Sequence, residues 1–117
     1  MITITFFAKE IEQNVKVNLE TITGFRTEGH AEYARHGKDI VCAAVSILVR
    51  NTINSFEAFT PAVFNYEEDE KKGMCEFKVL SEPTPETKIL FKSLLLGLQD
   101  IEEGYGEKYL RIDFQNS

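Results

Sequence analysis

The sequence predicts an α+β fold in which two helices pack on a mainly antiparallel sheet. Segments rich in β-branched and aromatic residues occur in two neighbouring pairs and once more at the end, and two long segments carry apolar residues at helical spacing. The resulting order is strand, strand, helix, strand, strand, helix, strand. Because the strands come in pairs and do not alternate singly with helices, α+β is favoured over a doubly wound fold. No repeat or linker divides the 117 residues, so we expect one domain over residues 1–117.

The first two strands are expected at residues 2–8 and 22–28, where β-forming side chains are concentrated. Between them, Val15, Val17 and Leu19 alternate with polar residues. Such alternation is typical of a half-buried strand. The segment either extends the second strand or forms a strand of its own, and the sequence does not decide between the two.

A first helix is expected from residue 40 to about residue 56, where apolar residues nearly encircle the helix axis. A helix of this kind is buried on most sides. Part of that burial could also come from a dimer interface. Asp39 directly precedes the helix and is expected to be its N-cap, because an aspartate there accepts a hydrogen bond from a free backbone N–H group.

Residues 63–66 and 75–80 are expected to form a hairpin around a charged turn at residues 67–73. The four consecutive acidic residues 67–70 are typical of a solvated hairpin tip, since a metal site would usually add His or Cys. Cys75 alternates with apolar residues on one face of its strand, so we expect it in the core.

Thr84 and Pro85 supply an N-cap and a first-turn proline for the second helix, which is expected to end at Gly104. Gly97 lies inside that helix at a cost of about 1 kcal/mol relative to Ala. We therefore expect another element to approach closely at Gly97. The last strand is expected at residues 109–114.

The composition argues against nucleic-acid binding and against a membrane protein. The chain has 13 Lys and Arg residues against 19 Asp and Glu, a formal net charge of −6, whereas phosphate binding requires clustered basic side chains. A basic partner suits this charge better. The chain has neither an apolar stretch of about 20 residues nor the features of a signal peptide. We therefore expect a soluble cytoplasmic protein with two free thiols.

The candidate nucleophile is Cys42. With Asp39 as N-cap, Cys42 is the third helical residue, where unpaired backbone N–H groups favour a thiolate and would also hold an oxyanion. His30 lies twelve residues earlier, at the end of a strand, and a loop of this length can return it to that turn as a general base. His36 is a weaker alternative, because it lies beside Gly37 in the connecting loop. Cys42 also fits a packing role, which is what most cysteines in apolar helices have.

A composite motif surrounds these positions. It comprises Gly29-His30-Ala31, Gly37, the run from Asp39 to Ala44, and Ser46. This motif resembles the family of ribosomal-processing cysteine proteases called Prp. The late helix around residues 97–103 and the terminal strand resemble that family as well, so the likeness covers nearly the whole chain. The polar stretch at residues 9–19 is longer than is usual in the family.

The resemblance implies that His30 and Cys42 are the catalytic pair and that Asp39 and Ser46 belong to the family pattern. It implies limited endoproteolysis that removes the N-terminal extension of a large-subunit ribosomal protein, the one numbered twenty-seven. It also implies a homodimer and a mobile loop over the site, here residues 31–38. No metal or other cofactor is needed for this chemistry, since a thiolate and a histidine suffice.

Several alternatives remain open at this stage. Asp39 either caps the helix or orients His30, and Ser46, one turn after Cys42, either contacts substrate or allows close packing. Two functions of other classes also fit the sequence. One is a noncatalytic binding module of ribosome assembly, and the other is a thiol redox sensor that uses Cys42 and Cys75.

Overall fold

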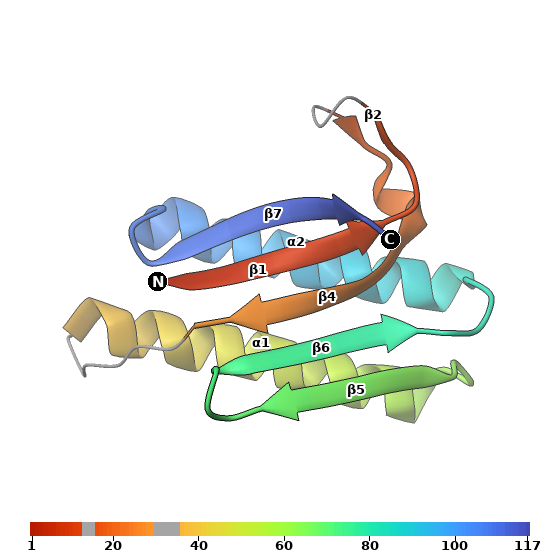
Figure 1. Ribbon diagram of the computed structural model, residues 1–117, viewed down its shortest axis with the longest axis horizontal. Helices are drawn as coiled ribbons and strands as arrows, with labels where there is room; N and C mark the ends of the chain where they lie inside the picture. Colours follow the sequence, from red (N-terminus) through yellow and green to blue (C-terminus); the bar gives the residue numbers. More distant parts are fainter. Residues whose placement is uncertain (13–15, 30–35) are drawn as a thin grey trace.

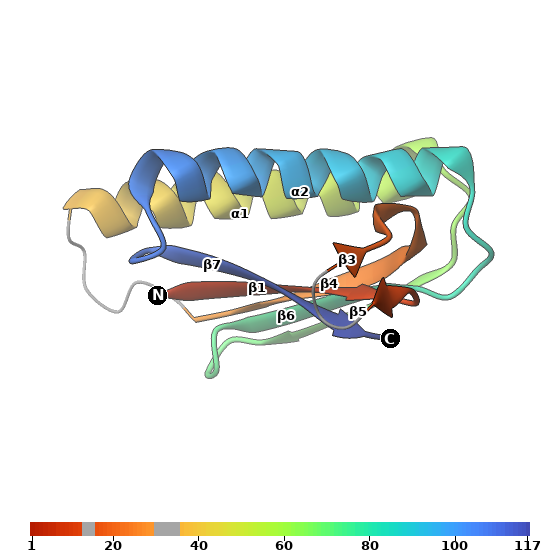
Figure 2. The same cartoon turned by 90° about the horizontal axis from the view of Figure 1, so that it is seen from above.

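The protein folds as one five-stranded sheet with two helices on one of its faces (Figure 1, Figure 2). The computed structural model describes residues 1–12, 16–29 and 36–117, with the backbone alone for residues 36–39. The predicted α+β class and the predicted order of strands and helices are confirmed. The sheet contains β1 (Ile2–Ala8), β4 (Ile22–Glu28), β5 (Phe64–Asp69), β6 (Met74–Val79) and β7 (Leu110–Asn116), in the spatial order β5-β6-β4-β1-β7.

The sheet is mainly antiparallel, as expected. The pairs β5–β6, β6–β4 and β4–β1 are antiparallel, whereas β1 and β7 are parallel. Parallel strands need a crossover connection, and the second helix lies before β7 in the chain. The predicted hairpin is formed by β5 and β6, although β5 extends to Asp69 and shortens the charged turn.

The stretch between β1 and β4 does not extend β4. Instead, β2 (Ile11–Glu12) and β3 (Lys16–Val17) form a separate two-stranded sheet, followed by a short 3₁₀ helix at Leu19–Thr21. Val15 lies outside the described residues. The stretch therefore forms an extra hairpin beside the end of β1 (Figure 1).

Helix α1 (His36–Phe59) begins earlier than the sequence predicted. Asp39 is its fourth residue, so the prediction that Asp39 is the N-cap is wrong, and His36 and Gly37 belong to the helix and not to a loop. Cys42 is consequently the seventh helical residue and lies beyond the first turn. The sequence missed this start because the first turn consists of polar residues and Gly37, so no apolar residues at helical spacing mark it as part of the helix.

Only one face of α1 is buried in this chain. Val41, Val45 and Phe56 are buried on that face, whereas the side chains of Ile40 and Ile47 are 43% and 68% exposed. The prediction of burial on most sides is therefore wrong for the single chain. Among the described helices, none is both long and apolar enough to cross a membrane.

Helix α2 (Pro85–Tyr105) begins as predicted. The Thr84 hydroxyl accepts a hydrogen bond from the Thr87 backbone N–H at 3.2 Å, and the Thr87 hydroxyl accepts one from the Thr84 N–H at 2.9 Å. This reciprocal arrangement is a capping box. The helix passes Gly104 and ends at Tyr105, followed by Gly106 with φ of 93°. The expected end at Gly104 was therefore slightly early.

Gly97 marks the predicted close approach. A Cβ atom added there would lie 2.9 Å from Leu48 Cδ1 of α1. The absence of a side chain on α2 thus lets the two helices pack against each other. Four phenylalanine rings fill the space between these helices and the sheet. They are Phe25, Phe56, Phe77 and Phe91, with centroids 4.9 Å apart for Phe56 and Phe77 and 4.8 Å for Phe56 and Phe91.

Gly24→Ala is expected to lower the free energy of unfolding by roughly 1–3 kcal/mol. A Cβ atom at Gly24 would lie 2.3 Å from the carbonyl oxygen of Phe77. That oxygen belongs to the backbone of β6, so it moves only if the pairing of β4 with β6 is distorted. Urea denaturation of the purified variant measures the loss.

Gly104→Ala is the matched control. A Cβ atom there meets nothing within 4 Å, and Ala is a better helix former than Gly by up to about 1 kcal/mol. The control should therefore be as stable as the parent or more stable. An unchanged stability of the Gly24 variant would contradict the register of β4 and β6.

Candidate active site

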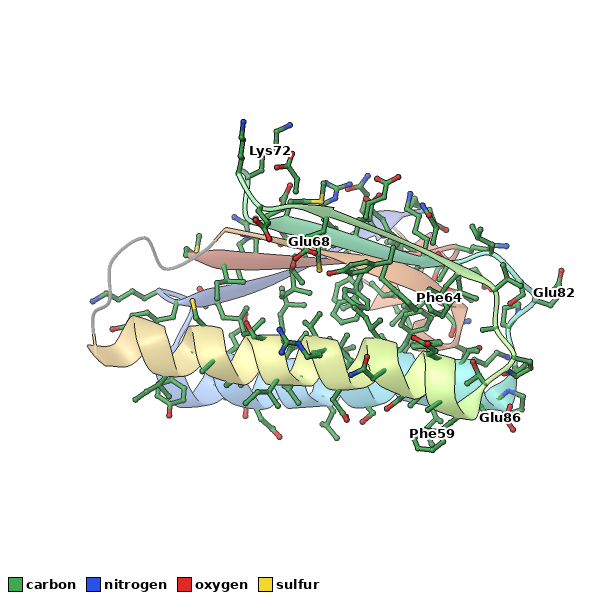
Figure 3. All side chains as sticks on the ribbon, turned by 90° about the horizontal axis from the view of Figure 1, so that it is seen from below. Phe59, Phe64, Glu68, Lys72, Glu82 and Glu86 are labelled. Carbon is green, nitrogen blue, oxygen red and sulfur yellow. The ribbon has the colours of Figure 1, made fainter. Side chains whose placement is uncertain are left out.

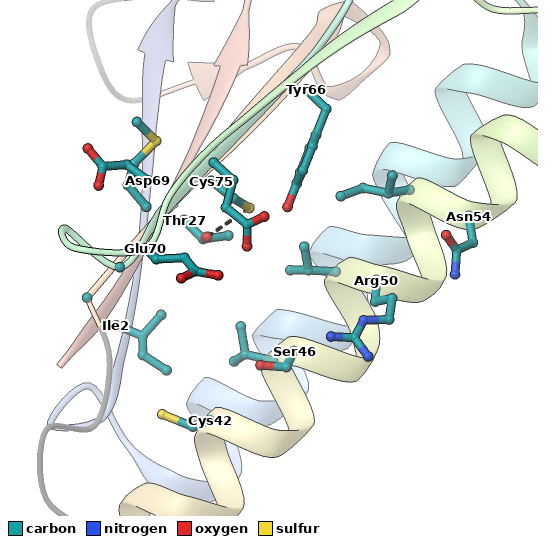
Figure 4. A pocket seen from close by; sticks show the side chains of 17 residues that line it. Ile2, Thr27, Cys42, Ser46, Arg50, Asn54, Tyr66, Asp69, Glu70 and Cys75 are labelled. Atoms are coloured by element: carbon teal, nitrogen blue, oxygen red, sulfur yellow. Dashed lines mark hydrogen bonds between the residues drawn. The ribbon is translucent and has the colours of Figure 1, made fainter.

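A cleft opens between α1 and the sheet, and Cys42 lies in its wall (Figure 4). Its volume is about 600 Å³, which lies within the range of ligand-binding pockets. Residues of α1, of the ends of β1 and β4, and of the β5–β6 hairpin line it. The Cys42 side chain is half-buried and packs partly against the core while it faces the cleft. The thiol is therefore not enclosed in the core.

The helical wall of the cleft carries four polar side chains in a row. Cys42, Ser46, Arg50 and Asn54 all line the cleft, and their spacing of four residues places them on one face of the helix in successive turns. Ser46 thus lines the same cleft as Cys42. The aliphatic side chains between them form an apolar floor. They are Val45, Val49 and Ile53.

The opposite wall consists of sheet residues. Thr27 of β4 and Cys75 of β6 face the cleft, and the Thr27 hydroxyl and the Cys75 sulfur are 3.1 Å apart. Cys75 is only half-buried, although it also contacts the core. The prediction that Cys75 is a core residue is therefore only partly right, because both thiols of the chain line the same cleft.

Tyr66 of β5 projects towards α1 across the cleft (Figure 4). Burial is the main cause that raises the pKa of Tyr66 to about 12, and the nearby Glu68 carboxylate contributes to that rise. The Tyr66 hydroxyl therefore keeps its proton near neutral pH. It offers a neutral hydrogen-bond donor to whatever occupies the cleft.

Acidic residues of the β5–β6 hairpin also line the cleft. Glu68, Asp69 and Glu70 line it, whereas Lys72 projects away from the sheet at the hairpin tip (Figure 3). Within the part of the chain whose side chains are described, no group of three or more His, Cys, Asp or Glu residues is placed to hold a metal ion. The hairpin side of the cleft thus carries acidic side chains, and the helical wall carries Arg50.

Gly29 connects β4 to the segment that contains His30. Its φ is +90°, and an added Cβ atom would lie 2.4 Å from the carbonyl oxygen of Met1. Only glycine suits both conditions, and Gly29 itself lines the cleft. His30 and residues 31–35 lie outside the described residues, as do the side chains of His36 and Asp39. The pairing of His30 with Cys42 therefore stays a prediction.

Sequence reasoning did not single out Tyr66 or Arg50. A signal existed for both residues. Tyr66 is two residues after the partly buried Phe64 in β5, so the two side chains share the face of the sheet that α1 covers. Arg50 is eight residues after Cys42, which places it on the same helical face. Neither signal is informative until the helix and the hairpin are known to face each other.

Comparisons with known proteins identify the family of the chain. A family model described as cysteine protease Prp matches residues 1–110. The ribosomal processing cysteine protease Prp of Staphylococcus aureus is 27% identical over 106 residues, which cover 90% of this chain and 99% of that protein. The protein of the same name from Bacillus subtilis is 32% identical over 89 residues, or 72% of this chain and 79% of the relative.

A solved structure extends the likeness to three dimensions. The essential ribosomal processing protease Prp from S. aureus, crystallised with a covalently linked product peptide, has a TM-score of 0.79 and 26% identity, with 98% of this chain and 100% of that chain covered. These matches define the class of the chain, which is that of the cysteine proteases. It belongs to the cysteine protease Prp family. The resemblance found in the motif around Cys42 is thereby confirmed at the level of the family.

Proposed function

We propose that the chain is a cysteine endopeptidase that removes the N-terminal extension of a large-subunit ribosomal protein, the one numbered twenty-seven. Cys42 lies in the wall of a cleft of about 600 Å³, and this position is the main support for the proposal. A cleft of this size suits a short peptide segment. The S. aureus relative is named for ribosomal processing and was crystallised with a covalently linked product peptide, which supports a peptide in this cleft.

In the proposed reaction, the Cys42 thiolate adds to the scissile carbonyl carbon and forms a C–S bond. The C–N bond then breaks, and the departing amine takes a proton from His30. A water molecule that gives a proton to His30 attacks the thioester and releases the carboxylic acid and the thiolate. Every atom and proton in this sequence comes from the peptide, the water, Cys42 or His30, so no metal or other cofactor takes part.

The corrected start of α1 changes the roles proposed for residues near its N-terminus. Asp39 stands fourth in the helix, and an acidic residue in the first turn interacts favourably with the helix dipole. We assign Asp39 this stabilising role in place of the N-cap. The dipole effect fades beyond the first turn, so the proposed reaction assigns to His30 the positive charge that favours the Cys42 thiolate.

The proposed partner is a basic protein in the cytoplasm. The chain carries a formal net charge of −6, and Glu68, Asp69 and Glu70 are among the residues that line the cleft. Complementary charge accelerates encounter. We also propose a homodimer, supported by the exposed apolar side chains Ile40 and Ile47 on α1.

The test of the proposed function is incubation of the purified chain with the leader-bearing ribosomal protein, followed by intact-mass measurement. We expect one cut that releases the leader and leaves the remainder whole. A relative that cleaves its own substrate under the same conditions serves as the positive control. If that control works and the substrate of this chain keeps its full mass, the proposal is contradicted.

A thiol redox sensor is the second candidate function, and one observation favours it. Cys42 and Cys75 line the same cleft, so an oxidant that enters reaches both thiols. Mild peroxide treatment and non-reducing peptide mapping would distinguish the two functions. A reversible Cys42–Cys75 disulfide in a chain without proteolytic activity would favour the sensor.

A further inference from the structure

The position of Cys42 within α1 leaves the oxyanion of the proposed reaction without the expected backbone donors. In an α-helix, the N–H of each residue beyond the first turn donates to the carbonyl group four residues earlier. Cys42 is the seventh residue of α1, so its own N–H and those that follow it are already paired. Acyl transfer nonetheless requires a hydrogen-bond donor beside the developing negative charge.

The Ser46 hydroxyl is placed to be that donor. Ser46 lies one turn after Cys42, is exposed, and lines the same cleft. Two threonine hydroxyls, one within α1 and one directly after it, already donate hydrogen bonds to backbone carbonyl oxygens. Thr52 donates to Leu48 at 2.8 Å, and Thr60 donates to Phe56 at 2.7 Å. The Ser46 hydroxyl has no such partner among the residues that the structure describes.

The distances along α1 favour Ser46 over Arg50, and the position of Tyr66 favours Ser46 as well. Side chains four residues apart on a helix have their Cβ atoms about 6 Å apart, and the oxyanion lies two bonds from the Cys42 sulfur. Arg50 is a further turn away, about 12 Å from Cys42 along the helix axis. Tyr66 belongs to the opposite wall (Figure 4). Ser46 is therefore the donor on the nearest turn of the helix that carries the nucleophile.

We propose that the Ser46 hydroxyl donates the hydrogen bond that stabilises the oxyanion of the tetrahedral intermediate. As the Cys42 thiolate adds to the carbonyl carbon, the C–S bond forms and the π electrons move to the oxygen. Ser46 donates a hydrogen bond to that oxygen and keeps its proton. When the intermediate collapses, the C=O bond reforms and the C–N bond breaks. This inference rests on the proposed function and deepens it by giving Ser46 a role in catalysis.

Ser46→Ala tests the inference. Loss of one oxyanion donor is expected to lower kcat by roughly 100-fold to 1,000-fold, with KM changed by less than about threefold, because the hydrogen bond strengthens as the negative charge forms. Alkylation of Cys42 by iodoacetamide creates no oxyanion, so its rate should stay the same. Ser46→Thr keeps the hydroxyl and should recover part of the lost kcat. Alanine is the best helix former and Ser46 is exposed, so the variant is expected to fold.

A peptide aldehyde supplies a second readout, because its adduct with Cys42 carries an oxyanion-like oxygen. Its inhibition constant should rise at least tenfold in Ser46→Ala. Ser55→Ala, in the same helix but away from the cleft, is the control and should match the parent in every assay. A kcat within about threefold of the parent, or an equal loss of kcat and of alkylation rate, would overturn the role of Ser46. A parent chain that cleaves no leader-bearing substrate would instead refute the proposed function.

Discussion

Cys42→Ala is expected to abolish leader cleavage, with a loss of rate of roughly 10⁴-fold or more. The thiol is the only group that forms a covalent bond with the substrate in the proposed reaction, so no neighbouring side chain replaces it. The fold should persist, because Ala suits a helix and the Cys42 side chain is only half-buried. Leader release followed by mass spectrometry measures the rate, and urea denaturation measures the stability.

Two further variants sharpen this result. Cys42→Ser keeps the size of the side chain and should also be inactive, because a serine hydroxyl is a much weaker nucleophile than a thiolate at neutral pH. Cys75→Ser is the matched thiol control and should retain at least a tenth of the parent rate. Its stability should fall only slightly, because a serine hydroxyl can keep the contact with Thr27. Normal cleavage by either Cys42 variant would remove Cys42 from the mechanism.

His30→Ala is expected to have the second-largest effect, a loss of cleavage of roughly 10²-fold to 10⁴-fold. The substitution removes the group that moves the proton and also the cation that favours the thiolate. The alkylation of Cys42 should therefore slow as well, which distinguishes a base from a residue that only binds substrate. Steady-state cleavage and timed iodoacetamide labelling measure the two effects.

His36→Ala is the control for the other histidine of the chain. His36 is the first residue of α1 and has no proposed role in proton transfer, so both rates should stay within about threefold of the parent. A larger loss in His36→Ala than in His30→Ala, in both assays, would show that the base has been assigned to the wrong histidine.

The sequence predicted those parts of the fold whose signals are local. The bounds of β1 and β4 follow from short runs of β-forming residues. The start of α2 follows from Thr84 and Pro85, which supply cap chemistry that depends on neighbouring residues alone. The close approach at Gly97 also followed, because glycine inside a helix otherwise has a cost without a benefit.

Two errors arose at α1 because the relevant information is not local. Its first turn is polar, so the hydrophobic pattern begins four residues after the helix does. Its apolar density predicted burial on most sides, yet Ile47 is exposed, because the chain offers a sheet and α2 to only part of the helix surface. The number of apolar residues in a helix does not reveal how many other helices and strands pack against it.

The sequence pointed to a candidate nucleophile but not to the shape of the cleft around it. The motif around Cys42 made this thiol the candidate, which stays a prediction, and helical spacing placed Ser46 one turn after it. The contribution of Tyr66 and the approach of Cys75 to the same cleft depend on the packing of the β5–β6 hairpin against α1. The spacing of residues along the sequence does not predict how the hairpin packs against the helix.

Whether Cys42 is an activated nucleophile can be read from the alkylation rates of the two thiols. Limiting iodoacetamide is added to the folded chain near neutral pH, and peptide mapping by mass spectrometry follows Cys42 and Cys75 separately. Both thiols line the same cleft, so differences in access are smaller than between a surface thiol and a core thiol. We expect Cys42 to be labelled at least tenfold faster than Cys75. Equal and slow labelling of the two thiols would contradict it.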